Sequence, residues 1–362
     1  MTTIRKMIGQ MLIMGFAGYD VDEHSPVTEW IQRDAIGGVL LFDYDFPNQQ
    51  FGKNLKNKTQ IKSLNEKLYK YSLQANDDKE CLPLFIALDY EGGDIDRLKY
   101  IDDCVQTIPP VMQAKLSDDA LLQEARIMAH TLKSLGFNLN FAPVVDLNLN
   151  DQVGIIGKRG RSFSNDPIEV IRAANQFVKA FKEHDIVCCY KHFPGHGSAL
   201  GDTHEGFVDV TDTFDSKELI PYEVLLKERN APIMVMTAHV VNHHLDNTGL
   251  PATLSYPILT GLLRNKLQYE GIIISDDLQM HAISNHYQLS EALARTINAG
   301  ADMLIFGNQL GQINAPEVID CIEALVESGE VQRSRVEESF QRIHHFKKKH
   351  ITVDKSFELN LA

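Results

Sequence analysis

The chain has 362 residues, of which 44% are apolar and 23% are charged, as is typical of a folded globular protein. Its formal net charge of −14 disfavours binding to nucleic acid or to an anionic membrane surface, and only the run Lys347-Lys348-Lys349 opposes it. We therefore expect neither partner, and a monomer or weak homodimer as the assembly state.

The N-terminal segment leads into an apolar patch that ends at Phe16, is interrupted by Gly9 and Gln10, and has no small-residue cleavage site. We expect no signal peptide, and no apolar run approaches the ~20 residues needed to cross a bilayer. The cysteines are odd in number and scattered, which favours neither a disulfide framework nor a structural zinc site. These features predict a reducing, cytoplasmic setting.

Eight short apolar runs alternate along the chain with longer amphipathic segments. The runs are predicted to be buried parallel strands. They are Met11–Phe16, Gly38–Phe42, Leu84–Asp89, Asn138–Asp146, Ile186–Lys191, Ile233–His239, Gly271–Asp276 and Ala301–Phe306. Helices are predicted between them over Asp118–Leu135, Pro167–Glu183, Ser216–Arg229 and Leu289–Ala299.

Strand and helix alternate eight times without a linker, which predicts a single (β/α)8 barrel domain over residues 1–362. A doubly wound open sheet would place a glycine-rich phosphate turn after the first strand, and Gly15-Phe16-Ala17-Gly18 lacks its third glycine. Residues 316–350 are predicted to form two helices outside the barrel, separated at Ser328-Gly329, with the basic end in solvent.

Polar residues follow the predicted strands at their carboxyl ends, where barrel enzymes carry their active sites. The strongest concentration is Lys191–His204, which holds one lysine, three histidines and one aspartate after an apolar run. Charged or polar residues also end neighbouring strands at Asp89, Asp146, His239 and Asp276-Asp277. The sequence therefore predicts a polar pocket at this end of the barrel.

Several reactions would suit such a pocket. A barrel metallohydrolase would share the histidines, but the first strand offers no metal ligand. A phosphate-binding isomerase or aldolase would not place two carboxylates, Asp276 and Asp277, after strand seven. Glycoside cleavage uses a carboxylate nucleophile and a proton donor. Either aspartate could attack, although strand alternation predicts that only one faces the pocket. His204 is a candidate proton donor, oriented by Asp202.

The segment Lys191–His204 resembles the signature of the family 3 β-N-acetylglucosaminidases, Lys-His-Phe-Pro-Gly-His-Gly followed after four variable residues by Asp-Thr-His. Gly271–Met280 resembles that family's nucleophile strand, and Leu88–Arg97 resembles its sugar-binding segment. Arg161-Ser162-Phe163 matches a further substrate-binding motif, and Phe141–Asp146 adds to the similarity. The resemblance extends over almost the full chain.

This resemblance implies a retaining exo-β-N-acetylglucosaminidase that acts through a covalent glycosyl-enzyme on muropeptides or chito-oligosaccharides, without a metal or other cofactor. It implies that Asp276 is the nucleophile and that His204, oriented by Asp202, is the acid/base. The implied sugar-binding residues are Asp89, Arg97, Arg161, Lys191 and His192. Gly195 and Gly197 would let the loop swing over the substrate, His196 would be structural, and His239 is a candidate pocket residue.

Two departures from the family pattern are Asp94 and Asp96, which replace an arginine and a glutamine and are predicted to make the pocket rim more acidic. We expect no second α/β domain of the kind that many family 3 enzymes carry, because the resemblance to members with the histidine loop implies that it is often dispensed with. Three alternatives remain: a β-N-acetylglucosaminide phosphorylase using the same residues, a non-catalytic sugar-binding barrel and, more distantly, a metallohydrolase. A neutral imidazole as acid/base suits phosphorolysis because it does not repel phosphate.

Overall fold

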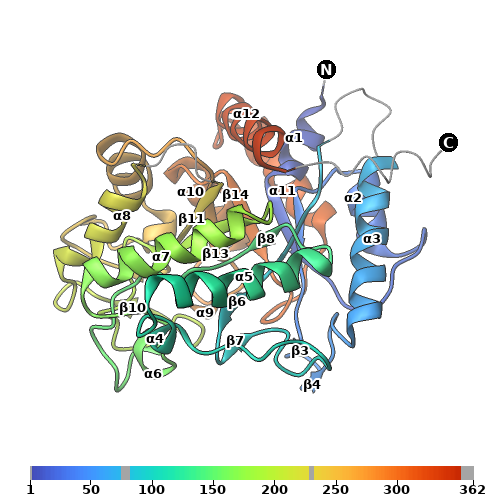
Figure 1. Ribbon diagram of the computed structural model, residues 1–362. Coiled ribbons are helices and arrows are strands. Elements are labelled where there is room, and N and C mark those ends of the chain that lie inside the picture. The colour runs from blue at the N-terminus through green and yellow to red at the C-terminus, as the bar shows by residue number, and fades with distance from the viewer. Residues whose placement is uncertain (1, 75–81, 228–231, 352–362) are drawn as a thin grey trace.

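The computed structural model of the protein describes residues 2–74, 82–227 and 232–351. Eight parallel strands pair in chain order and close into a barrel, which confirms the predicted fold class (Figure 1). These strands are β1 (Leu12–Gly15), β2 (Gly38–Leu40), β5 (Phe85–Leu88), β8 (Leu139–Asn140), β9 (Val187–Phe193), β11 (Ile233–Thr237), β13 (Ile273–Asp277) and β14 (Met303–Phe306).

Strand lengths differ from the prediction on two neighbouring strands. The predicted strand Asn138–Asp146 is shorter in the structure, where β8 has two paired residues and one further bridge joins Val144 to Lys191. Pro143 interrupts it because proline has no N–H for the ladder. Strand β9 instead continues two residues beyond its predicted end at Lys191, so His192 as well as Lys191 belongs to the strand itself. Both side chains are thereby fixed by barrel backbone.

Helices surround the barrel, and two of the predicted ones begin with a side-chain cap. Ser117 Oγ accepts a hydrogen bond from Ala120 N, and Asp166 Oδ1 accepts one from Ile168 N. The α-helices are α1 (Ile4–Gln10), α2 (Pro26–Gln32), α3 (Lys58–Gln74), α4 (Pro110–Gln113), α5 (Asp118–Ser134), α6 (Ile155–Lys158), α7 (Pro167–Lys182), α8 (Ile220–Leu225), α9 (His281–Ser284), α10 (Leu289–Ala299), α11 (Ala315–Glu327) and α12 (Arg333–His350).

The remaining helical elements are the 3-10 helices η1 (Ser216–Leu219) and η2 (Ala252–Leu254) and the π-helix η3 (Pro257–Lys266). Helix prediction over Ser216–Arg229 corresponds to η1 followed by α8, and residues 228–229 lie outside the described part. None of the helices in the described ranges has both the length and the apolar character required to span a membrane.

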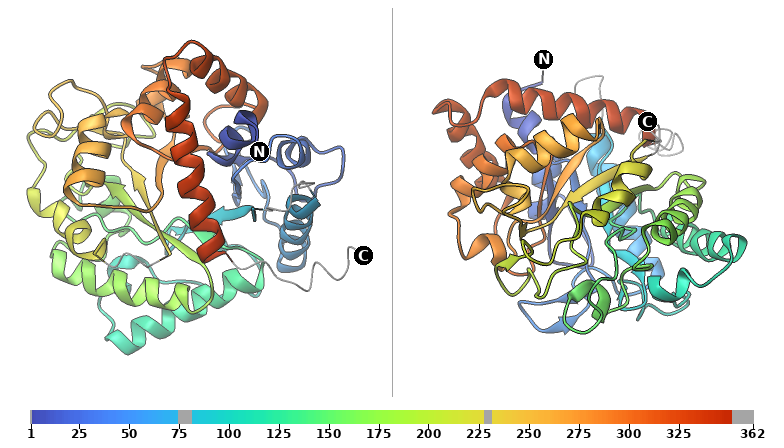
Figure 2. Two further views of the ribbon diagram at one scale, coloured as in Figure 1. Left: turned by 90° about the horizontal axis from the view of Figure 1, so that it is seen from above. Right: turned by 90° about the vertical axis from the view of Figure 1, so that its left-hand side faces the viewer.

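The helices α11 and α12 form at the predicted tail, and α12 crosses the amino-terminal end of the barrel (Figure 2). The predicted solvent exposure of the basic run is wrong for Lys347, which is fully buried. Its Nζ donates to Gln10 Oε1 at 2.9 Å and Gly37 O at 2.7 Å and lies over the Phe85 ring. The helix directs this side chain into the barrel end, where backbone carbonyls replace water.

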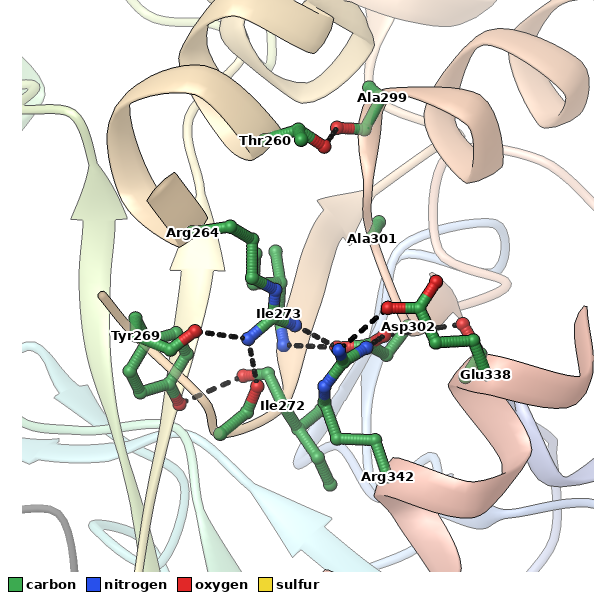
Figure 3. Close-up of polar contacts among 12 residues, drawn as sticks. Thr260, Arg264, Tyr269, Ile272, Ile273, Ala299, Ala301, Asp302, Glu338 and Arg342 are labelled. Carbon is green, nitrogen blue, oxygen red and sulfur yellow. Dashed lines mark hydrogen bonds and ion pairs between the residues drawn. The ribbon is translucent and has the colours of Figure 1, made fainter. Parts of the chain in front are cut away.

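A buried carboxylate before β14 joins the same helix to the barrel. Asp302 pairs with Arg264 of η3 and Arg342 of α12 (Figure 3). It also pairs with Arg335 of α12. Its Oδ2 also accepts a hydrogen bond from Ile273 N of β13 at 2.9 Å. The amino-terminal end of the barrel is therefore closed by a charged network that stabilises the scaffold.

Loops at the opposite, carboxyl end carry three small sheets: β3 (Tyr44–Asp45) with β4 (Gln50–Phe51), β6 (Tyr90–Gly92) with β7 (Ile95–Asp96), and β10 (Val208–Asp209) with β12 (Val240–Val241). Figure 1 shows these sheets with α4, α6 and α9 along one edge, away from α12. The loops that could form a site are thus collected at one end of the barrel.

Candidate active site

A cavity of about 450 Å³ lies at the carboxyl end of the barrel. Its wall includes all eight residues that the sequence singled out as catalytic or sugar-binding. They are Asp89, Arg97, Arg161, Lys191, His192, Asp202, His204 and Asp276. Strands on different sides of the barrel, the segments after β5 and β8 and the long loop after β9 contribute these side chains, so barrel closure brings residues distant in sequence to one place.

One buried carboxylate, Glu91, holds two of the cations in this wall. Arg161 donates to it through Nε at 2.9 Å and Nη2 at 2.7 Å, and Lys191 Nζ lies 2.7 Å from Oε1. Lys191 also donates to Asp89 at 2.9 Å. Burial alone would raise the pKa of Glu91, but the charges of Arg161 and Lys191 outweigh it and lower the pKa. The two cations are therefore held in place without substrate.

Asp146 holds His192 in a similar way. Its carboxylate accepts hydrogen bonds from the backbone N–H of His192 and from its Nδ1 at 2.7 Å, and from the backbone N–H of His196 at 2.9 Å. Burial favours the neutral acid, yet the His192 charge and hydrogen bond lower the pKa of Asp146. With Nδ1–H donated to Asp146, Nε2 of His192 is the nitrogen that can contact a ligand.

The loop after β9 brings His204 to the cavity. His204 Nδ1 lies 2.6 Å from Asp202 Oδ1, which also accepts the backbone N–H of His204 at 2.9 Å. The neighbouring Thr203 carbonyl accepts a hydrogen bond from Ala282 N of α9, directly after strand β13. Burial lowers the pKa of His204, but the hydrogen bond to Asp202 and the charge of Asp276 raise it above the ordinary value.

The glycines at the base of this loop are tightly packed, which disfavours the predicted hinge at Gly195 and Gly197. A Cβ on Gly197 would lie 1.9 Å from the Leu147 carbonyl oxygen, and one on Gly195 would lie 2.8 Å from Glu218 Cβ. Residues 191–199 are all buried, whereas exposed positions begin at Leu200. Glu218 Oε2 accepts the Gly197 N–H at 2.8 Å. The glycines allow close packing of a fixed base.

Asp276 and Asp277 both line the cavity, contrary to the expectation that only one would face it. The reason is a register irregularity between Ile274 and Asp277 in the pairing of β13 with β14, which breaks the alternation of side chains. Burial raises the pKa of Asp276, but nearby His239 and His192 lower it below its ordinary value. Burial instead raises the pKa of Asp277 to about 6. Asp276 is therefore the carboxylate that stays ionised at lower pH.

Several candidate residues lie behind the cavity wall or beside it. His239 is fully buried, with Nδ1 2.8 Å from Thr253 Oγ1 and Nε2 2.9 Å from the Asp277 carbonyl, and it does not line the cavity. Asp94 and Asp96 line a separate depression, whose lining shares Arg159 with that of the cavity. The predicted extra acidity of the rim therefore falls outside the cavity.

His196 remains consistent with a structural residue: it is buried and burial lowers its pKa to about 4. Sequence reasoning named no role for Glu91, Asp146 or Glu218, although Glu91 and Asp146 stand inside the quoted motifs. For Glu91 and Asp146, the sequence shows an acidic residue near the end of a strand. Such a residue indicates a site but does not indicate which side chain it pairs with. Within the described residues, no group of three or more histidines, cysteines and acidic residues is arranged to hold a metal ion.

Comparison with known proteins identifies the family. The family model of the glycosyl hydrolase family 3 N-terminal domain matches residues 3–346. The chain is 34% identical over 333 residues to beta-hexosaminidase A of Pseudoalteromonas piscicida, covering 84% of this chain and 53% of that protein. It is 30% identical to a beta-hexosaminidase of Photobacterium profundum, covering 84% of each. The chain thus spans about half the length of the Pseudoalteromonas protein.

The solved structure of a family 3 beta-N-acetylglucosaminidase from Paenibacillus superposes with a TM-score of 0.84 at 27% identity, covering 99% of this chain and 68% of that one. Fold, cavity and sequence therefore agree, and the chain belongs to glycosyl hydrolase family 3.

Proposed function

We propose that the protein is a retaining exo-β-N-acetylglucosaminidase that releases terminal N-acetylglucosamine from β-glycosides. The observation that carries this proposal is one cavity that contains an ionised carboxylate, Asp276, and an imidazole, His204, already hydrogen-bonded to Asp202. Names of the relatives support the same chemistry, because they are beta-hexosaminidases and a beta-N-acetylglucosaminidase.

In the proposed reaction, Asp276 attacks the anomeric carbon and forms a glycosyl-enzyme while the bond to the leaving oxygen breaks. His204 gives the leaving oxygen a proton from Nε2, since Nδ1–H is donated to Asp202. Water then attacks the anomeric carbon, His204 takes its proton, and the Asp276 carboxylate is released. The raised pKa of His204 keeps the acid form available near neutral pH.

The cations and carboxylates deeper in the wall are proposed to bind the sugar hydroxyls. Lys191 and Arg161, held in position by Glu91, would donate hydrogen bonds to sugar hydroxyls, and Asp89 would accept hydrogen bonds from other hydroxyls. Arg97 lies 3.4 Å from Asp43 and 3.6 Å from Asp89, which orients its guanidinium toward the same wall. Because these side chains are preorganised, binding the sugar in the reactive geometry costs less entropy.

The deciding experiment compares hydrolysis of aryl β-glycosides of N-acetylglucosamine, glucose and N-acetylgalactosamine, each with and without phosphate. We expect release of N-acetylglucosamine at a rate that phosphate does not change. Formation of the sugar 1-phosphate would instead establish a phosphorylase, and a rate lost after chelation would support metal catalysis. Turnover of none of these substrates, with retained sugar binding, would favour the non-catalytic barrel.

Two variants test the assigned roles. Asp276→Ala should reduce kcat by about a thousandfold or more, because the covalent step is lost. His204→Ala should reduce kcat strongly for substrates with a sugar leaving group. It should reduce kcat only slightly for a dinitrophenyl glycoside, because dinitrophenolate departs without a proton. Unchanged turnover by Asp276→Ala would overturn the nucleophile assignment.

We also propose that the natural substrates are small N-acetylglucosamine-containing carbohydrates, such as chito-oligosaccharides or muropeptides, and that the enzyme works in a reducing, cytoplasmic compartment as a monomer or weak homodimer. Free thiols at Cys104, Cys188, Cys189 and Cys321 support the reducing setting. Size-exclusion chromatography with light scattering across a concentration series measures the assembly state.

A further inference from the structure

Three aromatic side chains at the rim of the active-site cavity are more than half exposed. Phe46 is 54% exposed, Phe51 is 60% and Tyr100 is 65%. Phe46 and Phe51 belong to the hairpin of β3 and β4, and Tyr100 follows β7. With the half-buried Tyr44, they form a continuous edge-to-face series: Tyr44–Phe46 and Tyr44–Phe51 at 5.1 Å between centroids, then Phe51–Tyr100 at 4.9 Å.

We call these four residues, Tyr44, Phe46, Phe51 and Tyr100, the aromatic platform. The platform is continuous with the cavity because Phe46 lines both. Gln309, another cavity residue, fixes the hairpin: its Nε2 donates to the Tyr44 carbonyl at 2.7 Å and its Oε1 accepts the Phe46 N–H at 3.2 Å. The loop after strand β14 therefore holds the backbone that carries Tyr44 and Phe46.

Exposed aromatic rings gathered at one place lack the burial that normally stabilises them, and such patches mark binding surfaces. Their ring faces carry negative electrostatic potential. The C–H face of a pyranose is apolar with weakly positive hydrogens, so it complements these faces. Within the described residues, the four rings of the platform have one cation–π contact, from Lys99 to the Tyr100 ring.

We propose that the aromatic platform binds the leaving-group sugars of β-linked N-acetylglucosamine oligosaccharides while the terminal sugar occupies the cavity. This inference rests on the proposed function. An exo-acting enzyme holds the terminal sugar at the strand ends, so the remaining sugars of the bound substrate must extend out of the cavity past its rim. Phe46 would contact the sugar next to the cleaved bond, and Phe51 and Tyr100 the sugars beyond it.

The test measures kcat/KM for the double variant Phe51→Ala/Tyr100→Ala on aryl N-acetylglucosaminide and on the β-1,4-linked N-acetylglucosamine dimer, trimer and tetramer. We expect the aryl glycoside and the dimer to be cleaved as by the unaltered enzyme. For the tetramer, kcat/KM of the double variant should be about tenfold lower, which corresponds to the loss of about one stacking interaction per ring. Tyr256→Ala is the matched control, because its ring is 59% exposed but lines a separate depression.

Each outcome decides between the two proposals. If the unaltered enzyme cleaves none of the N-acetylglucosaminides, the proposed function falls, and the platform assignment falls with it. If it cleaves them all and the double variant treats tetramer and dimer alike, only the platform assignment is wrong. An equal loss on every substrate, with an unchanged thermal unfolding midpoint, would also overturn it. A change of assembly state in the variant would identify the platform as a contact between copies.

Discussion

Glu91 and Arg161 form a buried bidentate ion pair, with Nε–Oε2 at 2.9 Å and Nη2–Oε1 at 2.7 Å, and the same carboxylate also holds Lys191. Glu91 itself does not line the cavity, so its effect on a ligand passes through the two cations that do. Removing its charge leaves Arg161 and Lys191 buried with too little compensating charge.

We expect Glu91→Gln to lower the free energy of unfolding by roughly 3 kcal/mol, as for broken buried ion pairs, and to raise KM. Chemical denaturation and steady-state kinetics measure both. Glu183→Gln is the matched control, since Glu183 binds Arg126 with the same two-pronged geometry at the surface. It should change the free energy of unfolding far less, because a solvent-exposed ion pair contributes little to stability. Equal effects of the two substitutions would contradict the role given to Glu91.

The basic limb of the pH profile should report His204. Hydrogen bonding to Asp202 raises the pKa of His204, so activity that needs its proton is present below that pKa and is lost as pH rises through it. Asp202→Asn should move the basic limb of kcat/KM to lower pH on oligosaccharides, and less so on a dinitrophenyl glycoside.

Asp209→Asn provides the control for this shift, because Asp209 lies 3.8 Å from His243 outside the cavity. It should leave the profile unchanged. An unmoved basic limb in Asp202→Asn would show that another group supplies the proton, and Asp277, whose pKa burial raises to about 6, would be the next candidate.

Glu218 should make stability depend on pH. Burial raises the pKa of Glu218 from 4.5 to about 7. A raised carboxyl pKa favours the folded state below the unfolded value, and this contribution is lost as pH rises from about 4.5 through about 7. Glu218→Gln should therefore be more stable than the unaltered protein at pH 8, by roughly 3 kcal/mol at most, and equal to it near pH 4.5. Parallel stability curves for the two proteins between those values would contradict this expectation.

Gly197 tests the fixed base of the loop. Gly197→Ala places Cβ 1.9 Å from the Leu147 carbonyl oxygen, so the backbone must shift and displace the loop. We expect at least a tenfold lower kcat/KM, since small misplacements of catalytic groups are costly. Gly261→Ala, with 3.8 Å to its nearest neighbour in η3, should retain activity. Normal kinetics in Gly197→Ala would show that the base can move.

The barrel and the candidate site differ in how far sequence predicts them. Periodic apolar runs indicate the strands, and barrel geometry then places Asp276 and His204 at one end, as the cavity shows. The partners of Arg161 and His192 could not be predicted, because the pairing of Glu91 and Asp146 depends on how neighbouring strands and loops approach. Phe46 was missed for another reason, since two-residue strands leave no periodic pattern.

The closure of the amino-terminal barrel end by α12 has a consequence for protein synthesis. Translation produces β1 more than 300 residues before the part of α12, from Arg335 to Lys347, that covers its end of the barrel. Until then Asp302 lacks two of its arginine partners and the Gly37 carbonyl lacks Lys347. The growing chain therefore has to keep eight apolar strands from aggregating before α12 can close this end of the barrel.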